Sequence, residues 1–138
     1  MQRKIRILFL AMVIAGCLIV TGFGNSASAM DMASKEGIFK VSYTSEPEAI
    51  PIGQMISWKL LVLTADGEPV VDAKISIEGG MPAHGHGLPT RPQVTKNLGQ
   101  GNYLIEGLKF SMPGRWVVTF IISSGGKTDS VTFPLQLQ

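Results

Sequence analysis

The sequence predicts an all-β fold, an immunoglobulin-like β-sandwich of about seven strands preceded by an N-terminal signal peptide. Three observations predict it. From Glu36 onward, short runs rich in β-branched and aromatic residues alternate with turn residues about every 8–12 positions. No segment keeps apolar residues at the helical period over three turns. The chain of 138 residues has the length of one domain.

The first 29 residues form the expected signal peptide. Arg3, Lys4 and Arg6 precede an almost entirely apolar run at residues 7–23, and the small residues Ala27-Ser28-Ala29 follow it. This order is typical of a secretory signal cleaved after Ala29. The mature chain then begins at Met30 and is expected outside the cytoplasm, in the periplasm.

Two other readings of the leader stay open. Ile14-Ala15-Gly16-Cys17 resembles a bacterial lipobox, in which Cys17 is lipidated, although the apolar residues that follow are unusual for a lipoprotein. The apolar run is also long enough to remain as an uncleaved membrane anchor, because about 17–25 apolar residues can span a bilayer. Both readings also place the folded part outside the cytoplasm.

Residues 30–35 are expected to be a flexible lead-in, and residues 36–138 the sandwich domain. In its first half, residues 37–44 (GIFKVSYT) and 54–64 (QMISWKLLVLT) alternate apolar and polar side chains, and prolines break the chain between them. Turn residues at 66–69 lead into residues 71–78 (VDAKISIE), with Val71 the first inward side chain.

Four further strands are expected in the second half. They are residues 93–98, 103–110, 115–123 and 129–137. Glycine, proline and serine separate them at residues 99–102, 111–114 and 124–127. Alternation along the clearest strands predicts the core. Its expected members are Ile56, Trp58, Leu60, Ile75, Tyr103, Ile105, Trp116, Val118 and Phe120.

Charge and cysteine content exclude several functions. Three of the twelve Lys and Arg residues lie in the leader, so residues 30–138 carry nine cations against ten carboxylates, a net charge of −1. No cationic surface remains for nucleic acid. Cys17 is the only cysteine, so the mature domain has no disulfide and no thiolate ligand. The serines lack a nucleophile motif, and no enzymatic activity is expected.

The most informative segment is Gly79–Pro89 (GGMPAHGHGLP). In an extended His84-Gly85-His86, both imidazoles leave on the same face and can chelate a transition metal. The nearby thioether of Met81 favours copper, especially Cu(I), and Met112 in a loop of similar composition is a candidate third donor. The alternative is structural: the methionines plug the open end of the core, and the histidines hold the loop by hydrogen bonds.

Three motifs in this region carry a family resemblance. They are Met81–Gly87, Gly101-Asn102-Tyr103 and Phe110–Trp116. Together they resemble the YtkA-like domain, which is related to FixH-type proteins. The resemblance implies a compact extracytoplasmic immunoglobulin-like domain. FixH-type members are associated with cation handling and the assembly of heme-copper oxidases, and similar small sandwiches such as CopC bind copper through His and Met.

The resemblance and the residues together predict an exported, non-enzymatic protein that binds copper or a similar soft cation as carrier or chaperone. The expected ligands are Met81, His84, His86 and Met112. FixH-type proteins keep a membrane anchor, whereas Ala27-Ser28-Ala29 predicts cleavage here. The alternative function is a metal-free interaction module for an envelope or respiratory protein.

Overall fold

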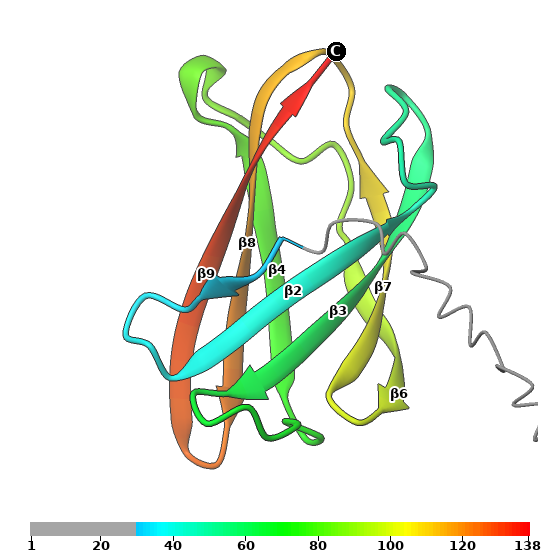
Figure 1. Ribbon diagram of the computed structural model, residues 1–138. Helices are drawn as coiled ribbons and strands as arrows, with labels where there is room; N and C mark the ends of the chain where they lie inside the picture. Colours follow the sequence, from blue (N-terminus) through cyan, green and yellow to red (C-terminus); the bar gives the residue numbers. More distant parts are fainter. Residues whose placement is uncertain (1–29) are drawn as a thin grey trace, which may run out of the picture.

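The computed structural model describes residues 30–138, which form two antiparallel sheets packed face to face (Figure 1). The leader, with its expected cleavage site, Cys17 and anchor alternative, lies outside these residues. One sheet has the strand order β1-β2-β3-β7-β6 and the other the order β5-β4-β8-β9. The strands are β1 (Met32–Ala33), β2 (Phe39–Glu46), β3 (Met55–Thr64), β4 (Lys74–Met81), β5 (His86–Gly87), β6 (Gln93–Gly99), β7 (Asn102–Lys109), β8 (Gly114–Ser124) and β9 (Lys127–Leu137).

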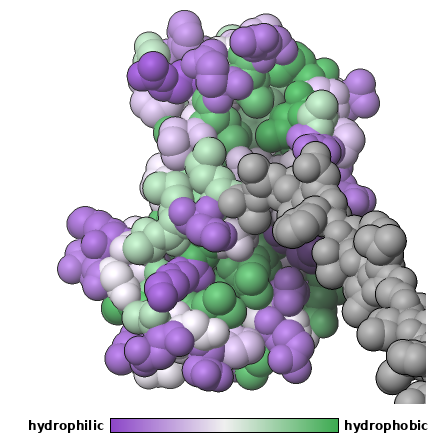
Figure 2. Space-filling model, viewed as in Figure 1, coloured by the Kyte–Doolittle hydropathy of each residue, from purple (hydrophilic) through white to green (hydrophobic). Residues whose placement is uncertain are grey.

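The predicted all-β sandwich is confirmed. Seven of the strands correspond to the seven expected ones, and the two-residue strands β1 and β5 are additions. Residues 30–138 contain both sheets and the core between them, so this part of the chain has what it needs to fold as one unit. No helix within it is long and apolar enough to cross a membrane. Hydrophilic residues are spread over the face seen in Figure 2, with hydrophobic ones showing between them.

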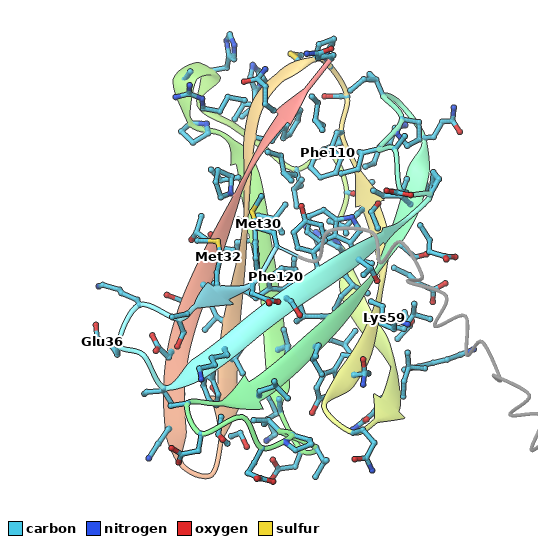
Figure 3. The ribbon with its side chains drawn as sticks, in the orientation of Figure 1. Met30, Met32, Glu36, Lys59, Phe110 and Phe120 are labelled. Atoms are coloured by element: carbon cyan, nitrogen blue, oxygen red, sulfur yellow. The ribbon has the colours of Figure 1, made fainter. Side chains whose placement is uncertain are left out.

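The core lies between the sheets and is rich in aromatic rings. Trp58 stacks on Tyr43 with ring centroids 3.8 Å apart, and Phe110 packs edge-on against Trp116 at 5.3 Å. Figure 3 places Phe110 and Phe120 in this interior. Of the nine predicted core residues, all are buried except Ile75, which is half-buried on the edge strand β4.

The third predicted strand begins later and ends later than its alternation suggested. Residues 71–73 are not in a strand, and Val71 is 54% exposed instead of pointing inward. The hydroxyl of Tyr103 causes the shift: it donates to the carbonyl of Val70 (2.6 Å) and accepts the N–H of Ala73 (2.9 Å). This tie resembles the tyrosine corner of immunoglobulin-like domains and holds residues 70–73 in an irregular conformation. Regular pairing with β8 starts at Lys74.

Residues 30–35 belong to the sandwich, although a lead-in was expected there. Met32 and Ala33 form β1 on the edge of β2. The buried hydroxyl of Ser34 donates to the carboxylate of Asp129 on β9 (2.5 Å), and the N–H of Lys35 donates to the carbonyl of Ser130 (2.8 Å). The start of the domain is therefore fastened to its last strand.

Candidate functional site

The segment with the two histidines is a tight turn, not an extended strand. Pro82–His84 form a 3-10 helix, and Gly85 ends it in the left-handed conformation (φ 63°) with its N–H directed at the carbonyl of Pro82 (3.4 Å). Proline fixes φ at the start of the turn, and glycine accepts a positive φ at its end. The prediction that His84-Gly85-His86 is extended, with both side chains on one face of a strand, is therefore wrong.

The turn nevertheless brings the two imidazoles together by another route. Their ring centroids lie 6.1 Å apart, at an interplanar angle of 38°, and both side chains are exposed. An ion about 2.0–2.1 Å from one nitrogen of each ring sets the centroids about 4.5–6.3 Å apart. The observed separation lies near the upper, almost linear end of this range, so a shared ion requires the side chains to rotate until one nitrogen of each ring faces the other.

Met81 lies directly beneath this turn. It is 2% exposed and is the cross-strand partner of His86, and such partners project to the same face of the sheet. Its terminal methyl group lies against Gly114: a Cβ built on Gly114 would come within 2.7 Å of it. Met81 therefore joins the hydrophobic core to the histidine turn, which fits the structural alternative as well as the ligand one.

Met112 reaches the same end of the sandwich from the loop between β7 and β8. This loop and the histidine turn both lie at the upper end of the sandwich in Figure 1, and β8 contacts the 3-10 turn. Met112 is 39% exposed, and its carbonyl accepts the indole N–H of Trp116 (3.0 Å). Because the ring of Trp116 is fixed in the core, the loop that carries Met112 is held from below. The two loops therefore share one end of the sandwich, and convergence of Met112 with the imidazoles on one site stays a prediction.

Among residues 30–138, no third imidazole, thiolate or carboxylate joins the two histidines in a group that could hold a metal ion. Beside the two imidazoles, the other two candidate ligands, Met81 and Met112, offer thioethers. Thioethers select soft ions such as Cu(I) and contribute little to binding hard ions.

Comparison with known sequences agrees with these motifs. The sequence model of YtkA-like domains matches residues 31–120. The chain belongs to the YtkA-like family. The match runs from β1 into β8 and includes all four candidate ligands of this YtkA-like protein. No curated protein sequence matches it.

A solved structure was also found for comparison with this YtkA-like chain. The ZirS C-terminal domain aligns with a TM-score of 0.40 and 12% identity, over 97% of this chain and 86% of that one.

Two supports of the site were not anticipated from the sequence of this YtkA-like protein. Gly114 leaves space for the methyl group of Met81, and Trp116, expected only as a core residue, holds the Met112 loop by a hydrogen bond. The segment Ser111–Trp116 (SMPGRW) contains both, but nothing in its spacing shows which atoms they contact.

Proposed function

We propose that this protein is an exported, non-enzymatic carrier or chaperone for copper or a similar soft cation. The observation that carries the proposal is the placement of two exposed imidazoles, with ring centroids 6.1 Å apart, at the end of the sandwich where Met81 and Met112 also lie. Copper is here the cargo, and the protein supplies the donor atoms.

The four residues have unequal expected roles. His84 and His86 are exposed and are the primary donors. Met112 is partly exposed and can add a sulfur to an ion on the histidine turn. Met81 is buried, so its sulfur can take part only if its side chain turns from the core toward His86. An exposed site with few protein donors favours a cargo that is passed on over one that is kept.

A Cu(I) competition titration against a chelator, under reducing conditions, tests the proposal. We expect one strong site per chain. His84→Ala and His86→Ala should each weaken binding about tenfold or more, because each removes one of two primary donors. Binding should also weaken in acid, because protons compete with the metal ion for the imidazole nitrogens.

The sulfur contribution is tested by Met112→Leu. This change should weaken Cu(I) binding more than Zn(II) binding, since zinc prefers imidazole and carboxylate to thioether. Met55→Leu is the matched control, because Met55 is a more exposed methionine (62%) outside the four candidates. If the double His84→Ala/His86→Ala variant binds copper like the parent, the site is not here, and the metal-free interaction module becomes the better hypothesis.

A further inference from the structure

Most sheet edges of the domain are protected against pairing with another chain. β1 and β5 have two residues each, and the register of β6 is interrupted twice. On the outer edge of β9, the carbonyl of Ser130 accepts the N–H of Lys35 (2.8 Å). The same direction recurs two and four residues later, so Pro134 also faces this edge, where it presents no N–H. Short strands, irregular pairing and edge prolines are the usual means of blocking edge-to-edge association.

The outer edge of β4 lacks these features. β4 pairs with β8 in continuous register from Lys74 to Gly80, and the chain contains no proline there. The carbonyl of Gly79 points away from β8, because it accepts the N–H of Leu88 (3.0 Å). This direction recurs at every second residue, so the N–H and C=O groups of Ile77 and Ile75 also face outward.

No strand of residues 30–138 pairs with these peptide groups, although β6 of the other sheet approaches β4. The order β5-β4-β8-β9 leaves one side of β4 open, except at Gly80 and Met81, which pair with β5. Figure 1 shows β9, β8 and β4 in succession, with β7 and β6 of the other sheet beyond β4 in this view. Ile75 and Ile77 are half-buried, whereas Ser76 is exposed on the outer face of the sheet. The edge therefore offers four unpaired backbone groups beside two partly exposed isoleucines.

The charged side chains along this edge are placed so that two copies of β4, paired antiparallel, bring opposite charges together. Lys74 and Glu78 lie two residues before and after Ser76, and all three are exposed on the same face. In an antiparallel pair centred on Ser76, Lys74 of each copy lies opposite Glu78 of the other. Opposite charges at directly opposed positions stabilise a strand pair, and like charges destabilise it.

The backbone directions agree with the same register. When Ser76 lies opposite Ser76 of a second copy, Ile75 lies opposite Ile77, and these are the residues whose peptide groups face outward. Each such pair exchanges two hydrogen bonds, so the two symmetric pairs use all four groups on each copy. Hydrogen-bond direction allows every register in which outward-facing residues lie opposite one another, and the charges select this register among them.

We infer that two copies of this chain associate through the outer edges of β4, antiparallel and with a two-fold axis at Ser76. The two four-stranded sheets then form one continuous sheet of eight strands. The contact is short, so the dimer is a weak one that forms at high micromolar protein. This contact involves none of the four proposed metal ligands, so the dimer and the copper site can be tested independently of each other.

Sedimentation equilibrium of residues 30–138 tests the dimer through its charges. Lys74→Glu and Glu78→Lys should each weaken dimerisation roughly tenfold or more, because each places like charges opposite one another twice. The double variant Lys74→Glu/Glu78→Lys should restore it, since the pairs are then reversed but again opposite. Lys59→Glu, at an exposed position on β3 in the middle of the other sheet, is the matched control and should leave it unchanged. A parent that stays monomeric, or single variants that dimerise as well as the parent, would overturn the inference.

A cross-link tests the position of the axis. Residues 30–138 contain no cysteine, so Ser76→Cys introduces a single thiol into the domain. Ser76 is expected in a non-hydrogen-bonded pair with Cα atoms about 4.5 Å apart, which lies within the range of disulfides. We expect a disulfide-linked dimer on mild oxidation. Gln136→Cys, exposed on β9, should form far less of it, and equal cross-linking of the two variants would contradict this register.

Discussion

Gly114 is a residue whose lack of a side chain shapes the candidate site. Its φ is 129°, and a Cβ at this position would come within 2.7 Å of the methyl group of Met81. A methyl group here has no space unless Met81 moves, and Met81 is the residue that links the core to the histidine turn. The backbone of the second loop thus limits the conformation of the first.

Gly114→Ala should therefore destabilise the domain by about 1–3 kcal/mol, through overpacking and an unfavourable backbone conformation. Urea denaturation measures this loss. Gly53→Ala is the control, because Gly53 also has a positive φ (78°) but has nothing within 4 Å of the position of its Cβ. If both variants lose the same stability, the contact with Met81 contributes nothing beyond backbone strain.

Asp129 is a buried carboxylate with an unusually complete set of donors. Burial raises its pKa, but hydrogen bonds from the Ser34 hydroxyl and from the backbone N–H groups of Ser130, Ile38 and Glu36 outweigh burial. The net pKa of Asp129 lies below its ordinary value. Charged Asp129 therefore stabilises the fold at neutral pH, and this stabilisation is lost as the pH falls through the lowered pKa.

Asp129→Asn should cost about 1–3 kcal/mol at pH 7, because it removes a charged acceptor from buried donors. The difference from the parent should shrink below about pH 4, where protonation removes the same charge from the parent. Urea midpoints across this pH range measure it. Asp66→Asn, at an exposed turn, is the control and should give a small, constant difference. A pH-independent difference for Asp129→Asn would mean that shape, and not charge, matters at this position.

Among the elements, the sequence predicted best the strands whose alternate side chains point into the core and out to solvent. β3 is the clearest: Ile56, Trp58, Leu60 and Val62 alternate without interruption, and all four are buried. Alternation of this kind indicates burial directly, because one face of the strand meets the other sheet. The three-residue error at β4 arose because a hydroxyl 30 residues away decides where regular pairing starts. A local pattern contains no information about such a contact.

Tyr103→Phe tests the tie that sets the start of β4. It removes one hydroxyl and leaves the carbonyl of Val70 and the N–H of Ala73 without this partner. We expect a loss of about 1–3 kcal/mol in unfolding free energy, measured by urea denaturation. The control is Tyr43→Phe, because the described contacts of Tyr43 with Trp58 and Phe133 use its ring. A Tyr103→Phe domain as stable as the parent would show that residues 70–73 keep their conformation without the tyrosine hydroxyl.

At the candidate site, too, the sequence predicted which side chains lie close together but not the backbone conformation that carries them. The residues pointed to two nearby imidazoles, and the structure has them, but in a 3-10 turn instead of a strand. Proline and glycine at both ends of the turn were visible in the sequence, and they favoured a turn over an extended segment. The short strand β1 could not be predicted from local sequence. The residues that follow it are held by a hydrogen bond from Ser34 to Asp129, which lies 95 residues later in the chain.

At the scale of the whole molecule, the sequence predicts the sandwich but not its pairing order. Period-two patterns and regular turns indicate two facing sheets. Which strands are neighbours depends on long-range contacts, such as that between β3 and β7, which join residues more than forty positions apart. This order places the Met112 loop and the histidine turn at the same end of the sandwich, so the position of the candidate site could not be predicted without the topology.

The antiparallel direction of β4 in the dimer also determines how far apart two metal sites lie, and so whether one affects ion binding at the other. Met81 lies five residues beyond Ser76, about 16 Å along the strand at about 3.3 Å per residue. Antiparallel pairing sends the two histidine turns to opposite poles, about 30 Å apart, while salt screens charge over about 8 Å. An ion at one pole then exerts almost no electrostatic force at the other. Occupancy of the two poles should be statistically independent, with a Hill coefficient of about 1 in monomer and dimer alike.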